Sequence, residues 1–460
     1  MTERNVDEFA RSQTQSWGNT MSGLARVREK ANKDKQQSFT ALMHHLTPEL
    51  LSQSFYQLKR QAAMGIDGMQ WQDYQEDLGS RLVDLQARIQ SGRYKPKPAR
   101  QVHIPKGNGE QRTLSIQCLE DKLVQQAVVT LLNQIYETDF LGFSYGFRPK
   151  RSQHDALDAL TYGLCKKKVN GVLDLDIRQF FDSVEHDRLI QMLQHRVRDK
   201  RLIKLIVRWI KVGAVDESGK RQAAHCGLPQ GAVISPLLSN IYLHYVFDQW
   251  SQQWRNRRAT GEVLIIRYAD DAVLCFQNQW EAKEYLRQLN SRLEKFGLTL
   301  HPEKTKLIQF GRFAAEQRAR HKQGKPETFD FLGFTHYCTV RRNGSFKVGR
   351  KTIRKRLVSQ IKAVQQGLRK RMHDPVDLTL KWLRSVITGH MNYYSVPGNG
   401  KQVSVFMNEI VRRWIKMLRR RSQRHTITGD RFGPWVRRKL PKVRIVHPYP
   451  EVRFRARYSK

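Results

Sequence analysis

The feature that most constrains the fold is a pair of adjacent acids between two apolar runs. Residues 263–268 and 272–276 are almost entirely apolar, and Ala269-Asp270-Asp271 joins them. Short apolar runs of this kind favour strands, and Asp is common in tight turns. The segment therefore predicts a β-hairpin that displays Asp270 and Asp271 at its tip. By itself an acid pair in a turn is weak evidence for a metal site.

A second acidic segment lies at residues 172–177, where apolar and acidic residues alternate. The period of two puts Asp174 and Asp176 on one face of a predicted strand. The opposite face carries Leu173, Leu175 and Ile177. Two carboxylates on one strand face repel each other unless a cation lies nearby.

Pairing of this strand with the hairpin would bring Asp176, Asp270 and Asp271 together. Carboxylate oxygens are hard ligands that suit Mg²⁺, and two such ions next to a phosphoryl group are typical of phosphoryl-transfer sites. The three acids therefore predict two Mg²⁺ ions, with Mn²⁺ as an alternative.

Charge identifies the class of partner. The 460 residues include 82 Lys and Arg against 42 Asp and Glu, a net charge of +40, and residues 341–460 hold 32 bases and 5 acids, a net of +27. A globular chain with this imbalance needs a polyanion such as nucleic acid. No apolar run of about 18 residues indicates a membrane span, and the N-terminus opens no signal peptide. The five scattered cysteines fit a reducing cytosol rather than disulfides or a zinc site.

Helical patterns are mixed with predicted hairpins along the chain, which favours an α+β core. Thr47-Pro48 resembles a helix start, with Thr as the cap and Pro in the first turn. Residues 412–421 form a basic helical pattern with Trp414 and Leu418 facing inward, one turn apart. Three aromatic residues lie among the Lys and Arg residues of the C-terminal region, and we expect that they could stack on nucleobases. They are Trp414, Trp435 and Tyr449.

Three motifs resemble the consecutive palm motifs of reverse transcriptases. They are Asp176-Ile177-Arg178-Gln179-Phe180-Phe181-Asp182, Leu228-Pro229-Gln230-Gly231 and Tyr268-Ala269-Asp270-Asp271. Further segments resemble the proteins encoded by group II introns: residues 230–243, Ser144-Tyr145-Gly146-Phe147-Arg148-Pro149, Glu303-Lys304-Thr305 and Phe331-Leu332-Gly333-Phe334. Ala232 and Ser115-Ile116-Gln117 depart from the family pattern, which has Gly and Gly-Ile-Pro there.

The resemblance implies a right-hand polymerase fold. We expect an N-terminal extension at residues 1–60, fingers at 61–165, a palm with part of the fingers at 166–340, and a basic helical thumb or maturase region at 341–460. Asp176 and Asp270 would be the main metal ligands, Asp271 the weaker third, and Ile177 would contribute to the metal and nucleotide sites. Lys304 matches a lysine proposed to protonate the pyrophosphate.

The resemblance also assigns substrate contacts. Phe181 matches the aromatic residue that excludes a 2′-hydroxyl, Lys106 and Arg112 match residues that grip the triphosphate, and Gln230 would contact the nucleotide. A point charge and a guanidinium fork suit phosphate oxygens. Four arginines of the C-terminal basic helix are expected to meet phosphates rather than read bases. They are Arg412, Arg413, Arg419 and Arg420.

The expected function is RNA-directed DNA polymerisation, with dNTPs, an RNA template, a DNA primer and their duplex as partners, and with structured intron RNA bound in a maturase role. No HNH endonuclease pattern follows the basic region, so target cleavage is not expected. Two alternatives remain: a domesticated enzyme in host DNA repair or defence, and a non-catalytic splicing cofactor, which the intact acids disfavour. A cytoplasmic, nucleoid-associated bacterial protein is expected, and the sequence indicates no oligomeric state.

Overall fold

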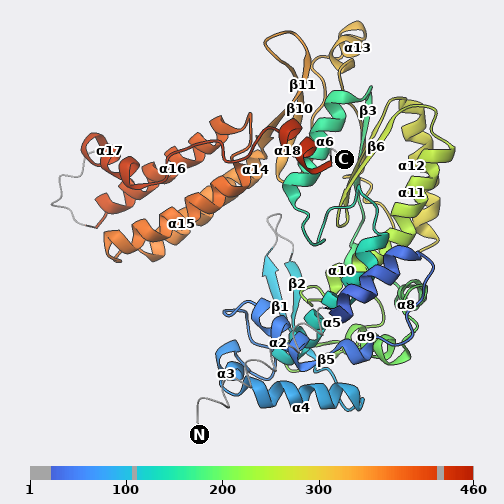
Figure 1. The fold of residues 1–460 in the computed structure, drawn as a ribbon. Coiled ribbons are helices and arrows are strands. Elements are labelled where there is room, and N and C mark those ends of the chain that lie inside the picture. The colour runs from blue at the N-terminus through green and yellow to red at the C-terminus, as the bar shows by residue number, and fades with distance from the viewer. Residues whose placement is uncertain (1–21, 106–110, 422–428, 459–460) are drawn as a thin grey trace.

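The computed structural model describes residues 22–105, 111–421 and 429–458 (Figure 1). Runs of helices are combined with antiparallel strand pairs, as in an α+β fold. In Figure 1, α2, α3 and α4 lie at the bottom, β3 and β6 stand at the upper right, and α14, α15 and α16 extend to the left. No helix among these residues is both long enough and apolar enough to cross a bilayer.

The N-terminal part is a helical layer around one long helix, α5 (Leu119–Asp139), whose apolar side chains are largely buried. Helix α2 (Pro48–Gln57) packs against α5. It begins as predicted, because the Thr47 hydroxyl accepts a hydrogen bond from the Leu50 amide at 3.3 Å and Pro48 occupies the first helical position. Residues 22–33 are helical, and the other elements here are η1 (Met43–His45), α3 (Trp71–Gln75) and α4 (Leu78–Gln90).

A small sheet in the order β2-β1-β4-β5 projects from this layer. Strands β1 (Ala99–Pro105) and β2 (Gln111–Ile116) are antiparallel, with Arg100 opposite Ile116, and become more exposed toward the connection between them. The short strands β4 (Ala214–Val215) and β5 (Arg221–Gln222) complete the sheet. Lys106 falls outside the described residues.

The central sheet, in the order β6-β7-β3-β8, is antiparallel throughout. Its strands are β3 (Gly171–Asp176), β6 (Val263–Tyr268), β7 (Asp271–Phe276) and β8 (Lys306–Gln309). Successive side chains point to opposite faces, so Leu173 and Leu274 belong to one hydrophobic core whereas Val172 and Val273 belong to a second. The sheet therefore separates two cores, which explains why its strands are apolar on both faces.

Helices cover both faces of this sheet. The helical elements of this part of the chain are α6 (Gln153–Lys166), α7 (Phe180–Ser183), α8 (His186–Gln194), α9 (Lys200–Lys211), α10 (Ser235–Leu243), the π-helical turn η2 (His244–Asp248), α11 (Gln249–Arg257), α12 (Gln279–Glu294) and α13 (Ala314–Arg320). Helix α6 contacts β6, and α12 contacts β3 and β7.

The second core continues from the sheet into the C-terminal elements. A three-stranded sheet, β9 (Phe329–Phe331), β10 (Phe334–Val340) and β11 (Phe346–Thr352), leads into α14 (Arg354–Lys370), α15 (Val376–Tyr394), α16 (Gly400–Arg419) and α17 (Gly429–Lys439). Helix α18 (Pro450–Tyr458) then returns to α6, where Arg453 contacts Asp158 at 2.5 Å. Trp414 and Leu418 are buried, as predicted.

Candidate active site

Three carboxylates meet at one end of the central sheet. Asp176 is the last residue of β3 and lies opposite Asp271, the first residue of β7. Strands β6 and β7 form the predicted hairpin, and Ala269 and Asp270 are its two-residue turn. Ala269 has a φ of 57°, a left-handed conformation that lets the chain reverse within two residues. The pairing of the two acidic segments, expected from the sequence, is therefore present.

The carboxylates disturb one another electrostatically. Burial raises the pKa of Asp271 to about 6, and the negative charges of Asp270 and Asp176 add to the effect. Burial and Asp176 also raise the pKa of Asp270. Beneath them, burial raises the pKa of Asp174 to about 7, with Asp271 and Asp176 contributing. This end of the sheet thus holds concentrated negative charge that a cation would stabilise.

The donor set suits a magnesium ion that shares its ligands with the substrate. Among the described residues no three His, Cys, Asp or Glu side chains converge closely enough to hold an ion by themselves. Mg²⁺ commonly takes one or two carboxylates and completes its shell with water and substrate phosphates. Asp176, Asp270 and Asp271 supply hard oxygens of that kind, whereas Ile177 could take part only through its main-chain carbonyl. The Lys304 ammonium lies 3.0 Å from Asp176 Oδ2.

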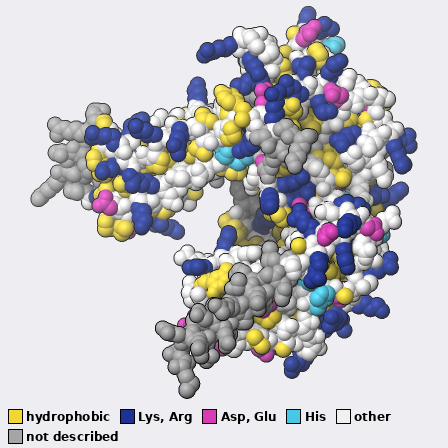
Figure 2. Space-filling view, viewed as in Figure 1, with side chains coloured by type: hydrophobic (Ala, Val, Ile, Leu, Met, Phe, Trp, Pro, Cys, Tyr) yellow, Lys and Arg dark blue, Asp and Glu magenta, His cyan; other side chains and the backbone are white. Residues whose placement is uncertain are grey.

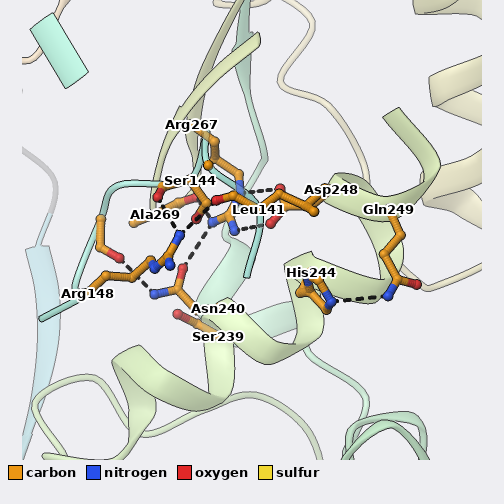
Figure 3. A network of polar contacts seen from close by, with 12 residues as sticks. Leu141, Ser144, Arg148, Ser239, Asn240, His244, Asp248, Gln249, Arg267 and Ala269 are labelled. Carbon is orange, nitrogen blue, oxygen red and sulfur yellow. Dashed lines mark hydrogen bonds and ion pairs between the residues drawn. The ribbon is translucent and has the colours of Figure 1, made fainter. Parts of the chain in front are cut away.

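A buried network holds the turn that carries Asp270 (Figure 3). Arg267 of β6 donates to Asp248 Oδ1 at 2.6 Å and to Asp248 Oδ2 at 2.5 Å. Its Nη1 also donates to the Ala269 carbonyl at 2.9 Å and to Asn240 Oδ1 at 3.0 Å. The main chain of this hairpin turn is therefore tied to helix α10 and to the π-helical turn η2 by one guanidinium group.

No role for Arg267, Asn240 or Asp248 was predicted from the sequence. A signal for Arg267 was present, because it is a charged residue within an apolar strand and a buried guanidinium needs partners. The partners were not predictable, since they lie 19 and 27 residues away and Asp248 ends a π-helical turn. Such turns often occur at functional sites.

Two of the predicted nucleotide-binding residues touch each other. Arg112 of β2 donates to Gln230 Oε1 at 2.8 Å, and Gln230 Nε2 donates to Asp182 Oδ1 at 3.1 Å. Gly231 has a φ of 107°, and a Cβ there would lie 2.9 Å from the Ser115 carbonyl oxygen, so only glycine allows this approach. This chain of contacts connects the small sheet to α7 beside the carboxylates. Asp182 is a further residue for which no role was predicted from the sequence.

Phe181 is partly buried and packs against the first core, with its ring 5.6 Å from that of Phe180. Its carbonyl accepts a hydrogen bond from the Leu228 amide at 2.6 Å, which joins two of the motifs. Gly227 lies against the same segment, since a Cβ there would be 3.0 Å from the Phe181 carbonyl oxygen. The backbone of Phe181 is therefore held against the loop that contains Gly227 and Leu228.

Comparison with known proteins identifies the family. The profile of the reverse transcriptase (RNA-dependent DNA polymerase) family matches residues 104–336, which contain all three carboxylates. The chain belongs to the reverse transcriptase family. This confirms the expected enzyme class, RNA-directed DNA polymerase, and the expected α+β polymerase fold.

Relatives of this reverse transcriptase include intron-encoded proteins. The chain is 36% identical over 274 residues to Protein YkfC of Escherichia coli strain K12, a match covering 53% of this chain and 71% of that protein. It is 33% identical over 232 residues to Group II intron-encoded protein LtrA of Lactococcus lactis subsp. cremoris, covering 49% of this chain and 37% of LtrA. It is 29% identical over 271 residues to Putative COX1/OXI3 intron 1 protein of Saccharomyces cerevisiae, covering 49% of this chain and 32% of that protein. The resemblance to group II intron proteins is confirmed.

The basic residues of α16 lie outside the reverse transcriptase match. The Arg412 side chain is 80% exposed and 3.4 Å from Glu409, whereas Arg413 is 29% exposed and pairs with the same carboxylate. The expectation that Trp414 could stack on bases is wrong, because its ring is fully buried in the core of the C-terminal helices. Trp435 is partly buried and Tyr449 is exposed.

Proposed function

We propose that this reverse transcriptase extends a DNA primer on an RNA template with dNTPs at the end of the central sheet. The observation that supports the proposal most is that two paired acidic segments place Asp176, Asp270 and Asp271 at the same end of the sheet, with pKa values raised for Asp270 and Asp271. Such a site favours cations, and bound cations can stabilise the negative charge that develops in phosphoryl transfer.

In this proposal Asp176, Asp270 and Asp271, with the Ile177 carbonyl, hold two Mg²⁺ ions. When bound, such ions would supply a lower pKa for the primer 3′-hydroxyl and stabilisation of the negative charge on the pyrophosphate. The protein then has to position these groups. Arg267 supports this by holding the Ala269 carbonyl, so the turn keeps one conformation when substrates exchange. Lys304, next to Asp176, is suited to donate a proton to the leaving pyrophosphate.

Arg112 and Gln230 bind the incoming nucleotide. Asp182 accepts a hydrogen bond from the side-chain amide of Gln230 and so orients it. The oxygen of that amide accepts a hydrogen bond from Arg112 Nε, which orients the guanidinium group. The remaining guanidinium nitrogens can then meet triphosphate oxygens. Lys106, on the connection between β1 and β2, is proposed to assist, and Phe181 to exclude a ribose 2′-hydroxyl.

The nucleic acid lies in the hollow between the C-terminal helices and the N-terminal layer. Figure 2 shows this face of the molecule hollowed there, with Lys and Arg side chains around the hollow. We assign residues 61–165 to fingers, 166–340 to the palm and 341–460 to the thumb, after an extension at 1–60. The net charge of +27 in the last segment favours RNA, including a structured intron RNA in a maturase role, and would keep the protein near the nucleoid.

Primer extension tests the proposal. The protein should add dTMP to oligo(dT) on poly(rA) in the presence of Mg²⁺, and Asp270→Ala should abolish this while leaving duplex binding largely unchanged. Asp187→Ala is the matched control, because Asp187 is an exposed acid at the start of α8. Near-normal extension by Asp270→Ala would remove the carboxylates from the proposed mechanism.

A further inference from the structure

The loop between α5 and α6 lies directly against the catalytic hairpin. Ser144 forms a parallel bridge with Arg267, the Tyr145 amide donates to the Arg267 carbonyl at 2.8 Å, and the Arg267 amide donates to the Phe143 carbonyl at 2.9 Å. This segment therefore adds a short stretch of strand to the edge of β6. It brings Phe147, which the proposed mechanism does not use, next to the acids.

Both neighbours of Phe147 are fixed in place. The Gly146 carbonyl accepts a hydrogen bond from Asn240 Nδ2 at 2.7 Å, and a Cβ on Gly146 would lie 2.2 Å from the Ala269 amide nitrogen. On the other side, the Arg148 guanidinium is buried, donates to the Leu141 and Ser144 carbonyls at 2.8 Å each, and pairs with Glu137 at 3.0 Å (Figure 3). Neither neighbour can move without breaking several buried contacts.

Between these anchors Phe147 has a φ of 55° and is 54% exposed. A left-handed conformation is unfavourable for a bulky residue, and strain of this kind is concentrated at functional sites. Glycine or asparagine would adopt this backbone more easily. The ring also buries too little surface to compensate by packing. Its centroid lies 6.3 Å from that of Tyr268, the last residue before the catalytic turn.

We propose that Phe147 and Tyr268 form an aromatic platform that binds the terminal nucleosides of the RNA/DNA duplex. The inference rests on the proposed function, because the primer end must lie beside Asp270, two residues from Tyr268. Bases inside a duplex are already stacked on one another, so the rings contact sugars and base edges. The wide, shallow minor groove of an A-form-like duplex exposes these groups. The platform positions the primer end and takes no part in proton or phosphoryl transfer.

Equilibrium binding of a fluorescent RNA/DNA duplex with a recessed primer, without dNTPs, tests the platform. Phe147→Gly and Phe147→Asn both suit the left-handed backbone, so their melting temperatures should equal or exceed that of the unaltered protein. Their Kd for the duplex should rise roughly five- to tenfold, the lower range for loss of an aromatic–base contact. Phe147→Tyr should bind normally. Trp280→Ala is the control, since Trp280 is 60% exposed on α12.

Abasic substitution locates the contact. Removing one primer base at a time should weaken binding by the unaltered protein at one position near the 3′ end, and Phe147→Gly should lose no further affinity at that position. An unchanged Kd for both Phe147 variants, or additive losses at every position, overturns the platform. Failure of the unaltered protein to bind or extend any RNA/DNA duplex would instead overturn the proposed function.

Discussion

Arg267 and Asp248 form a two-point ion pair that is almost completely shielded from water, with exposed side-chain fractions of 1% and 0%. A buried pair of this kind adds little to stability compared with apolar residues of the same size, but removal of one partner is costly. The same guanidinium also holds the Ala269 carbonyl. The pair therefore couples the stability of the core around β6 to the conformation of the hairpin turn that carries Asp270.

We expect Asp248→Leu to lower the free energy of unfolding by roughly 3–5 kcal/mol, because it leaves the charge of Arg267 buried without a counter-ion. The double variant Asp248→Leu/Arg267→Met should regain most of the stability in calorimetric melting. It should not regain the primer-extension rate, because nothing then holds Ala269. Recovery of both stability and rate in the double variant would show that the network has no positioning role.

Phe181→Val should increase incorporation of ribonucleotides relative to deoxynucleotides. A smaller side chain at this position leaves space for the 2′-hydroxyl, while the backbone contacts of Phe181 to Leu228 are kept. Single-nucleotide kinetics with dTTP and UTP on poly(rA)/oligo(dT) give the ratio. Phe180→Leu is a useful control, since Phe180 lies in the core beside Phe181. An unchanged ratio in the Phe181 variant would make this ring a core residue only.

Lys304→Ala should lower the rate constant of nucleotide addition by roughly 100-fold or more, the range expected for loss of general acid catalysis. The Kd of the primer–template duplex should change much less, because Lys304 contacts Asp176 and is not one of the residues proposed to bind the duplex. Single-turnover kinetics separate the two quantities. Lys304→Arg restores the charge but not a transferable proton, so rescue of the rate by arginine would point to electrostatic support instead.

The basic face of α16 should set the salt dependence of RNA binding. Removing one side chain that meets a phosphate should reduce the slope of log K against log salt by roughly 0.7–0.9. Arg413 is less exposed than Arg412 and lies closer to Glu409, so its contribution to the slope should be smaller than that of Arg412. The test variant replaces four residues with Gln: Arg412, Arg413, Arg419 and Arg420. The control variant replaces four exposed Lys and Arg residues with Gln. They lie at the end of α11, in the loop that follows it and in α12: Arg257, Arg258, Lys283 and Arg287. Equal slopes for the two variants would mean that this helix face does not follow the phosphate backbone.

The sequence predicted local structure well wherever one short segment determines it. The hairpin at Asp270, the cap at Thr47 and the inward pair Trp414 and Leu418 follow from patterns within a few residues. The same burial made the stacking role expected for Trp414 wrong, because a basic neighbourhood does not reveal which aromatic rings fill a core. The pairing of β3 with the hairpin could be predicted only as one possible arrangement, which was favoured because it brings the three acids together.

Interactions between distant segments were not predictable in the same way. Asp182 was visible in a motif, but its partner Gln230 lies 48 residues further along, and the connection depends on how α7 meets the loop before α10. The strained backbone of Phe147 is likewise set by Asn240 and Arg148, not by its own type. Such features depend on the assembled fold and have no local pattern.

The return of α18 to α6 has a consequence for synthesis of the chain on the ribosome. Asp158 is buried between Arg350 and Arg453, and Arg453 is 295 residues further along. Since contacts of such long range form late, the surface of α6 that α18 covers remains exposed until nearly all the described residues have been translated. Ribosome-stalled chains that stop before residue 453 should be cleaved near α6 faster than chains that include α18. The time window for misfolding or chaperone binding is therefore set by translation of the basic C-terminal region.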